Sequence, residues 1–204
     1  MNAGPAGAGS GAAGSGSGAA GAGAGVQPGL SAQPGPAVQP GPAVQLGRPV
    51  VLLLSGPNLG LLGEREPEVY GRATLEDHRA AAAAAATVAG LDLEHFQSER
   101  EGDLVEAIHA ARGRVAGIVV NPGAFTHYAW SLHDALAAFE GPVVELHLSN
   151  PARREAWRHR SVVSPVADAV IAGLGPDGYP MAVRALAALL SRVQGDPRAA
   201  DGAL

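Results

Sequence analysis

Five short apolar runs alternate with stretches of helical character after Pro49, and this alternation constrains the fold more than any other feature. The first run, 50–54, is apolar at every position, as expected for a strand covered on both faces. The other predicted strands cover 91–96, 117–120, 143–148 and 169–172. The predicted helices cover 74–89, 103–111, 130–139, 151–159 and 178–193. Strands that alternate with helices through right-handed crossovers form a parallel sheet covered on both faces, so we expect an α/β fold.

The first 48 residues differ in composition from the rest of the chain. No charged side chain occurs before Arg48, and the segment is nearly all Gly, Ala, Ser, Pro, Gln and Val. Such a segment cannot bury enough apolar surface to offset its chain entropy, so we expect a disordered tail over 1–48. We expect one folded domain over 49–195 and a second disordered tail over 196–204.

Charge and hydropathy limit the partners that the protein is expected to have. The net charge of −5 leaves no clustered basic surface of the kind that binds nucleic acid. The N-terminal segment lacks the basic and apolar parts of a secretory signal, and no stretch approaches the ~20 apolar residues that span a membrane. We therefore expect a soluble, cytoplasmic protein that contacts neither nucleic acid nor membrane.

Two residue types are missing from the sequence, and their absence removes whole classes of chemistry. There is no Cys, which excludes disulfides, thiolate nucleophiles and Cys-ligated metals. All 14 basic residues are Arg, so neither a lysine Schiff base nor a Walker A lysine is available.

The segment 56–71 follows the first predicted strand and is the first candidate for a site. Parallel sheets bind ligands outside the carboxyl ends of their strands, which is where this segment begins. It places Asn58, Arg65 and Tyr70 between glycines and prolines, a combination that argues against a plain surface loop. Phosphate binding is disfavoured, because the segment lacks both the Gly-x-Gly-x-x-Gly spacing and a Walker lysine.

Two further strand ends carry polar residues. The third predicted strand runs into Asn121 and, after a short turn, His127, which taken alone is more often a hydrogen-bonded histidine than a catalyst. On the fourth strand, period-two alternation points Glu145 and His147 to the same side. A carboxylate beside a histidine can orient the ring for general acid catalysis, although a salt-bridged surface pair is the alternative.

Ser149 and Asn150, ahead of Pro151, predict a helix N-terminus. Free backbone N–H groups and the helix dipole make such an end an anion site, which suggests a substrate with a carboxylate. Arginines on the following helix offer a bidentate clamp, although not all of them can face the site. These arginines are Arg153, Arg154, Arg158 and Arg160.

Three segments taken together, 56–71, 121–127 and 145–150, closely resemble type II 3-dehydroquinate dehydratase, and the resemblance extends over 49–193. It implies a flavodoxin-like three-layer sandwich whose trimers assemble into a homododecamer. It also implies a lyase that converts 3-dehydroquinate to 3-dehydroshikimate by trans elimination through an enolate. This reaction belongs to the shikimate pathway, which leads to chorismate and the aromatic amino acids. The resemblance implies an enzyme that works without a metal or a cofactor. The type I enzymes use a lysine Schiff base, which this chain cannot form.

The resemblance also implies catalytic roles for individual residues. Tyr70 matches the base that removes the proton next to the ketone, and Arg65 favours the ionised form of that tyrosine. Asn58 helps to stabilise the enolate through a water molecule. His147, oriented by Glu145, donates a proton to the departing hydroxyl.

Other positions match the family's substrate-binding residues. The substrate's hydroxyls and carboxylate are expected to be held by Asn121, His127, the backbone of Leu148 and Ser149, and Arg158. Asp134 matches an acidic residue that reaches the site of a neighbouring subunit. The sequence departs from the usual pattern at Ser55, Phe125 and 128–130, and none of these changes removes a catalytic group.

Alternative functions remain open at this point. The segment 173–178 matches the dinucleotide-binding fingerprint, but too little chain follows it for another strand–helix unit, so we interpret it as a tight turn. A flavodoxin-like binding module is disfavoured, because a receiver domain needs a lysine and an FMN loop would be richer in Ser and Thr. A third hypothesis is an interaction protein whose N-terminal tail carries the activity.

Overall fold

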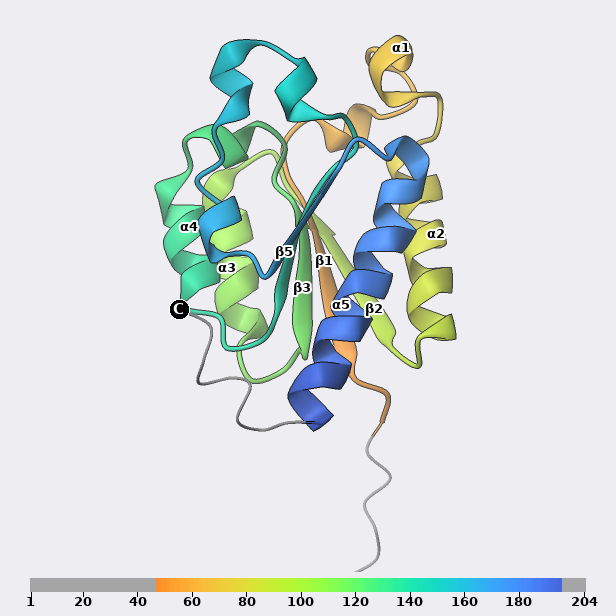
Figure 1. The fold of residues 1–204 in the computed structure, drawn as a ribbon, viewed down its shortest axis with the longest axis vertical. Coiled ribbons are helices and arrows are strands. Elements are labelled where there is room, and N and C mark those ends of the chain that lie inside the picture. The colour runs from red at the N-terminus through yellow and green to blue at the C-terminus, as the bar shows by residue number, and fades with distance from the viewer. Residues whose placement is uncertain (1–46, 196–204) are drawn as a thin grey trace, which may run out of the picture. The chain divides into compact units, whose positions relative to one another are not determined.

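The computed structural model describes residues 47–195 and contains a five-stranded parallel sheet (Figure 1). The strands are β1 (Val50–Ser55), β2 (Asp92–Gln97), β3 (Gly117–Asn121), β4 (Val143–His147) and β5 (Ala169–Ala172). Their order is β2-β1-β3-β4-β5, and each neighbouring pair is parallel. The predicted α/β fold and its five strands are therefore confirmed. The tails predicted over 1–48 and 196–204 lie outside the described residues, apart from Gly47 and Arg48.

Helices cover both faces of the sheet. Helices α2 (Leu75–Val88) and α5 (Gly178–Gly195) pack on one face, and α3 (Glu101–Ala111) and α4 (Trp130–Ala137) pack on the other (Figure 1). No helix within the described range is long and apolar enough to cross a membrane.

Strand β1 supplies side chains to both hydrophobic cores. Val51 and Leu53 belong to the core beneath α2 and α5, whereas Leu52 and Leu54 belong to the core beneath α3 and α4. Alternate side chains of a strand point to opposite faces, and all four are at least 96% buried. Burial on both faces explains why β1 is a continuous apolar run.

Helix α2 begins as the sequence predicts. The Thr74 side chain accepts a hydrogen bond from the Asp77 amide at 3.2 Å, and the Asp77 carboxylate accepts one from the Thr74 amide at 2.9 Å. These two bonds form the predicted capping box. Gly90 follows the helix with a φ of 76°, a conformation that glycine adopts without strain.

The continuous helix predicted over 151–159 is wrong. The structure has two 3-10 turns there, η3 (Pro151–Arg153) and η4 (Ala156–His159), separated by extended backbone at Arg154 and Glu155. Neither turn buries a side chain, so no apolar face supplies the packing that stabilises a helix of this length. The predicted helix dipole at Ser149 and Asn150 is therefore reduced to a single short turn.

Several short elements were not predicted from the sequence. The segment after β1 contains η1 (Leu59–Leu61) and α1 (Pro67–Tyr70), and β3 leads into η2 (Gly123–His127). Two more 3-10 turns, η5 (Ser164–Val166) and η6 (Gly175–Asp177), flank β5. The exception is η6, because the Gly-rich segment 173–178 was predicted to be a tight turn, and the structure confirms this turn.

Candidate active site

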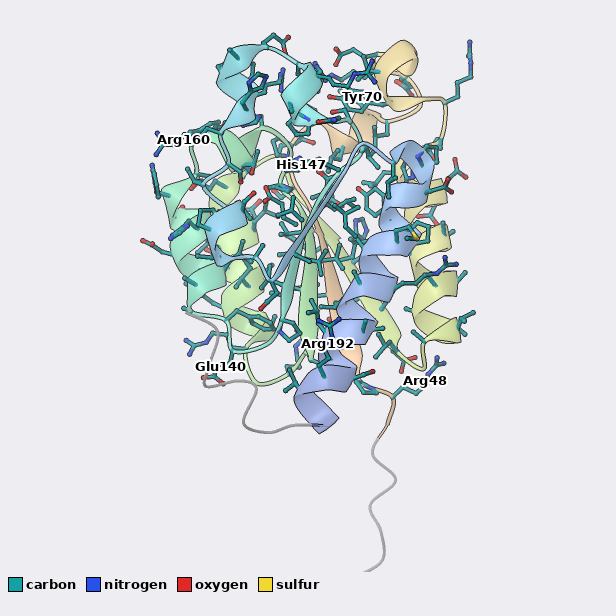
Figure 2. All side chains as sticks on the ribbon, viewed as in Figure 1. Arg48, Tyr70, Glu140, His147, Arg160 and Arg192 are labelled. Atoms are coloured by element: carbon teal, nitrogen blue, oxygen red, sulfur yellow. The ribbon has the colours of Figure 1, made fainter. Side chains whose placement is uncertain are left out.

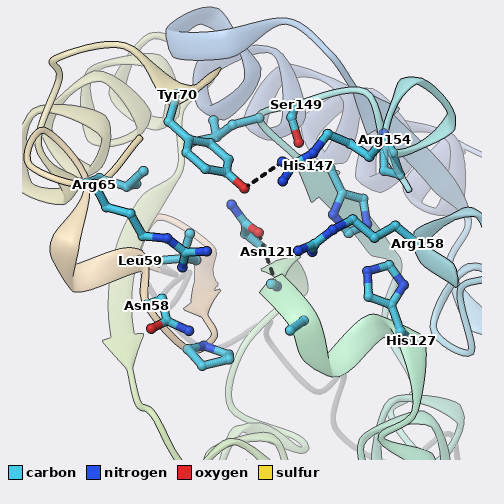
Figure 3. A pocket seen from close by; sticks show the side chains of 16 residues that line it. Asn58, Leu59, Arg65, Tyr70, Asn121, His127, His147, Ser149, Arg154 and Arg158 are labelled. Atoms are coloured by element: carbon cyan, nitrogen blue, oxygen red, sulfur yellow. Dashed lines mark hydrogen bonds between the residues drawn. The ribbon is translucent and has the colours of Figure 1, made fainter. Parts of the chain in front are cut away.

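A pocket lies at the carboxyl ends of the central strands, where the sequence predicted a site (Figure 3). Nine of the eleven predicted site residues line it, namely Asn58, Arg65, Tyr70, Asn121, His127, His147, Leu148, Ser149 and Arg158. Glu145 lies behind His147 and is 0% exposed. Asp134 is exposed on α4 and does not line this pocket. Tyr70 and His147 both lie at this end of the sheet (Figure 2), so the structure brings together the ends of strands that are far apart in the chain.

The ends of β1 and β3 are held in close contact beneath the pocket. The Gly56 amide donates to the Asn121 carbonyl at 2.8 Å, and a Cβ atom at Gly56 would lie 2.4 Å from the Pro122 carbonyl oxygen. Only glycine fits such an approach. Asn58 follows in the left-handed conformation with a φ of 64°, which Asn tolerates better than most residues. Its backbone N–H donates to Glu99 Oε2 at 2.7 Å.

Tyr70 is in contact with an arginine, but not with the arginine that the sequence indicated. Nη1 of Arg154 donates to Tyr70 Oη at 3.0 Å (Figure 3). This bond raises the pKa of Arg154 above its ordinary value. The predicted partner, Arg65, lines the same pocket and donates to Glu66 at 2.9 Å. The chain thus presents two guanidinium groups to the space around Tyr70, and Arg154 is the one bonded to it.

His147 and Glu145 form the pair that strand periodicity predicts. His147 Nε2 lies 2.8 Å from Glu145 Oε1, and the His147 side chain lines the pocket. Burial by itself would raise the pKa of Glu145, but hydrogen bonds from His147, Ser164 and Thr126 hold that pKa below its usual value. The pair is therefore an imidazole backed by a carboxylate in its charged form.

Asn121 is held in one orientation by residues beneath the pocket. Its Nδ2 donates to Tyr179 Oη at 3.2 Å, and its Oδ1 accepts from the Gly123 amide at 3.3 Å. Tyr179 is fully buried, and this burial raises the pKa of its hydroxyl. Ser55, at the end of β1, lies with its Oγ 3.1 Å from His95 Nε2. Tyr179 was not among the predicted site residues, because its side chain reaches Asn121 only through the packing of α5 on the sheet.

An aromatic side chain connects two of the predicted substrate-binding residues. The Arg158 guanidinium lies 4.0 Å from the centroid of the Trp157 ring, and the His127 ring meets the same indole edge-on at 5.2 Å. The Arg160 carbonyl oxygen can only accept a hydrogen bond, so His127 Nδ1, 2.8 Å away, carries the hydrogen and donates it. His127 therefore presents Nε2 as its free nitrogen. Trp157 restricts the positions of both polar groups.

The electrostatic character of the pocket suits an anion. Arg65, Arg154 and Arg158 line it, and Glu66 and Glu155 are engaged in ion pairs with these arginines at its rim. Arginine recognises carboxylates through paired N–H donors. The described residues contain no group of His, Asp and Glu that is arranged to hold a metal ion.

Comparison with known proteins gives a consistent result. Residues 49–187 match the family described as Dehydroquinase class II. The chain is 55% identical over 140 residues to 3-dehydroquinate dehydratase 2 of Agrobacterium fabrum, covering 69% of this chain and 95% of that protein. It is 56% identical over 137 residues to 3-dehydroquinate dehydratase 1 of Corynebacterium efficiens, covering 67% and 91%.

Solved structures are similar over the same region. The type II dehydroquinase from Butyrivibrio crossotus superposes with a TM-score of 0.66 at 38% identity, covering 68% of this chain and 97% of that one. The type II dehydroquinase from Propionibacterium acnes gives a TM-score of 0.65 at 43% identity, covering 68% and 96%. Sequence and fold thus point to the same group of proteins.

Proposed function

The chain belongs to the class II dehydroquinase family and is a lyase that dehydrates 3-dehydroquinate to 3-dehydroshikimate in the shikimate pathway, and from this premise we propose how its pocket divides the two proton transfers. Tyr70 is the base and His147 is the acid. The observation that supports this division is that Tyr70 and His147 contact side chains of opposite charge. A guanidinium contacts Tyr70, whereas a buried carboxylate contacts His147.

The base step requires an ionised Tyr70. Two unit charges of opposite sign 4 Å apart attract each other by ~4 kcal/mol at an effective dielectric constant of ~20. The Arg154 guanidinium, 3.0 Å from Tyr70 Oη, supplies such a charge, and Arg65 lines the same pocket. The phenolate of Tyr70 takes the proton from the carbon next to the ketone, and Asn58 stabilises the resulting enolate through a water molecule.

The acid step completes the elimination. The enolate re-forms the ketone, its electron pair forms the new carbon–carbon double bond of the enone, and the carbon–oxygen bond to the leaving hydroxyl breaks. His147 Nδ1 donates the proton that lets this group depart as water. Nε2 stays bonded to Glu145 at 2.8 Å throughout, so the ring keeps one orientation. Tyr70 gains one proton and His147 loses one, so the number of protons on the enzyme is unchanged by one turnover, and no cofactor is consumed.

The remaining predicted residues bind the substrate in this proposal. Asn121, His127 and Arg158, together with the backbone of Leu148 and Ser149, hold its hydroxyls and its carboxylate. All five line the pocket. The contacts of Asn121 with Tyr179 and of Arg158 with Trp157 support the assignment, because a preorganised group loses less conformational entropy when it binds.

The assembly and the cellular location belong to the proposal as well. We expect a homododecamer of four trimers in which Asp134 reaches the site of a neighbouring subunit. The exposure of Asp134 on α4, away from the pocket of its own chain, supports this role. A molar mass measured by light scattering that corresponds to fewer than three chains would contradict it. A cytoplasmic location is expected for an enzyme of small-molecule biosynthesis, and cell fractionation tests it.

The experiment that tests the proposed roles follows the ultraviolet absorbance of the conjugated enone product after 3-dehydroquinate is added. The wild-type protein should produce a steady rise. Tyr70→Phe should abolish the rise while isothermal titration still detects ligand binding, because only the phenolic oxygen is removed. A wild-type rate in Tyr70→Phe would show that the base lies elsewhere.

A further inference from the structure

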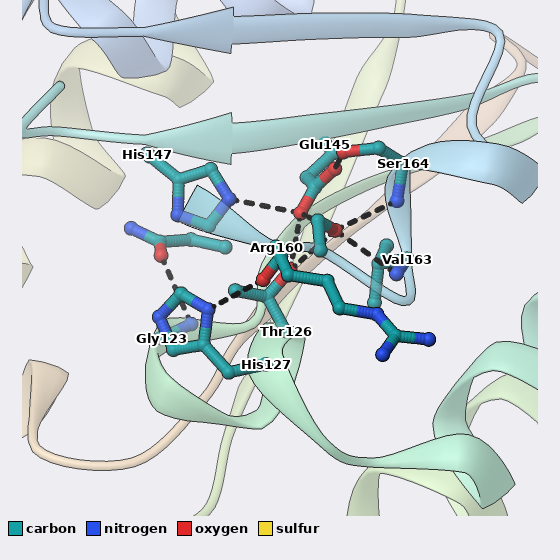
Figure 4. A network of polar contacts seen from close by, with 10 residues as sticks. Gly123, Thr126, His127, Glu145, His147, Arg160, Val163 and Ser164 are labelled. Carbon is teal, nitrogen blue, oxygen red and sulfur yellow. Dashed lines mark hydrogen bonds and ion pairs between the residues drawn. The ribbon is translucent and has the colours of Figure 1, made fainter. Parts of the chain in front are cut away.

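Three hydroxyl groups surround the carboxylate of Glu145, and none of them comes from the strand that carries it (Figure 4). They belong to Thr126 of η2, to Ser164 of η5, and to Ser161 in the connection before η5. Together with His147 they provide four contacts to one carboxylate. Oε1 faces His147, Thr126 and Ser161, and Oε2 faces Ser164.

Three or four of these groups donate to the carboxylate at once, depending on where the hydrogen of Ser161 goes, and this is within what a carboxylate can accept. An ionised carboxylate accepts about four hydrogen bonds and donates none. Glu145 is 0% exposed, so water cannot replace a missing donor at low cost. The hydroxyl groups therefore complete the environment that a buried negative charge requires, and a neutral carboxylic acid would not require it.

The backbone fixes the direction of one of these hydrogen bonds. Ser161 Oγ accepts from the amides of Val163 at 3.0 Å and Ser164 at 2.8 Å. Both of its lone pairs are thus occupied, and its own hydrogen must be donated. That hydrogen goes either to Glu145 Oε1 at 2.9 Å or to Thr126 Oγ1 at 2.7 Å, which itself contacts Oε1. In both arrangements the hydroxyl groups deliver hydrogens to the carboxylate.

A carboxylate that can only accept determines where the hydrogens of His147 reside. Nε2 must carry a hydrogen to bond with Glu145 Oε1 at 2.8 Å. The second hydrogen of the charged ring is then on Nδ1, and this ring lines the pocket. If Glu145 took the Nε2 hydrogen instead, the pair would become neutral, and the hydrogen on Nδ1 would belong to a neutral imidazole, which is a much weaker acid than the charged ring.

We propose that Thr126, Ser161 and Ser164 are positioning residues for the proton-donating step, because they keep Glu145 ionised and thereby keep His147 in its charged, more acidic form. This inference rests on the proposed role of His147 as the acid. The alternative is that the hydroxyl groups serve folding alone, as partners for a buried charge. The two possibilities differ in what happens to the enolate.

The fate of the enolate is measured as a ratio in deuterium oxide. Exchange of the hydrogen next to the ketone reports the base step, and formation of the enone reports the acid step. A weaker acid lets more of the enolate return to substrate, so the ratio of exchange to elimination rises even if the base step limits turnover. Loss of folded protein lowers both rates equally and leaves this ratio unchanged.

Two variants remove donors from different carboxylate oxygens. Ser164→Ala removes the donor to Oε2, and Thr126→Val removes one at Oε1. Each variant should raise the ratio of exchange to elimination roughly tenfold and change KM less than about twofold. The loss of a hydrogen bond to a charged group changes a rate or equilibrium constant by about one order of magnitude or more. Thr126→Ser, which restores the hydroxyl, should restore the ratio. Ser191→Ala on the exposed face of α5 is the matched control.

The outcomes separate this inference from the function on which it rests. Wild-type ratios in both Ser164→Ala and Thr126→Val, with the His147→Asn variant inactive in elimination, would overturn the inference and leave the role of His147 intact. Full elimination by His147→Asn would instead refute the proposed acid.

A further measurement uses the wild-type protein and therefore tests the inference even if Ser164→Ala and Thr126→Val do not fold. In the wild-type protein, the carboxyl carbon resonance of Glu145, assigned by comparison with Glu145→Asp, should keep the chemical shift of an ionised group across the pH range of activity. A carboxyl that becomes protonated within that range would contradict the inference.

Discussion

Replacing Arg154 by methionine tests which arginine supports the base. Arg154→Met removes the guanidinium that donates to Tyr70 Oη at 3.0 Å and keeps a long apolar side chain in its place. The full Coulomb attraction at 4 Å is ~4 kcal/mol at an effective dielectric constant of ~20. The Arg154 side chain is 17% exposed and also lies near Glu66 at 3.8 Å and Glu155 at 3.6 Å, which offset part of this attraction.

About half of that attraction, ~2 kcal/mol, should therefore be lost in Arg154→Met, which corresponds to a roughly 30-fold decrease in kcat. Arg154→Lys keeps a charge but not the planar donor geometry, so its decrease should be smaller. The matched control is Arg153→Met, because Arg153 is exposed and does not line the pocket.

The assay measures hydrogen exchange and elimination in deuterium oxide. Because Arg154 acts on the base, its loss should slow both processes by the same factor, which leaves their ratio at the wild-type value. A wild-type exchange rate in Arg154→Met would refute the reasoning. An equal loss in Arg153→Met would refute it as well, since that result would show a general effect of charge.

Three further predictions concern stability, binding and domain organisation. Because the pKa of Glu145 is lowered in the folded protein, its ionised form stabilises the fold above the ordinary pKa of ~4.3, and this stabilisation is lost as the pH falls through the lowered value. Ser164→Ala should therefore move the midpoint of acid unfolding, followed by circular dichroism, to higher pH. An unchanged midpoint would contradict this prediction. Trp157→Ala removes the ring whose centroid lies 4.0 Å from the Arg158 guanidinium. An exposed cation–π contact contributes ~0.5–1 kcal/mol, so KM should rise roughly two- to fivefold while kcat stays unchanged. A fall in kcat alone would count against a binding role for Arg158. Deleting residues 1–47 should leave the steady-state rate intact if 49–195 is the catalytic domain, and a loss of activity in the folded remainder would support a function for the N-terminal segment.

Local patterns in the sequence predicted the parts of the structure that depend on neighbouring residues. The apolar run of β1, the capping box of α2 and the shared side of Glu145 and His147 follow from strand and helix periodicity. The site location also followed, because parallel strands deliver their carboxyl ends to one edge of the sheet.

The contacts that were missed join residues far apart in the chain. The bond between Arg154 and Tyr70 spans 84 residues, and no local pattern distinguishes Arg154 from the other arginines of its segment. Ser161 reaches Glu145 only because the chain after η4 returns beneath His147. The helix predicted over 151–159 failed for a related reason, since its formation depends on an apolar contact surface that the fold does not provide.

The central claim is that Tyr70 removes the first proton and His147 delivers the second. The most direct test compares hydrogen exchange and elimination with 3-dehydroquinate in deuterium oxide for Tyr70→Phe and His147→Asn. The account predicts that Tyr70→Phe loses both processes, whereas His147→Asn retains exchange and loses elimination. Exchange at the wild-type rate in Tyr70→Phe, or elimination at the wild-type rate in His147→Asn, would contradict it.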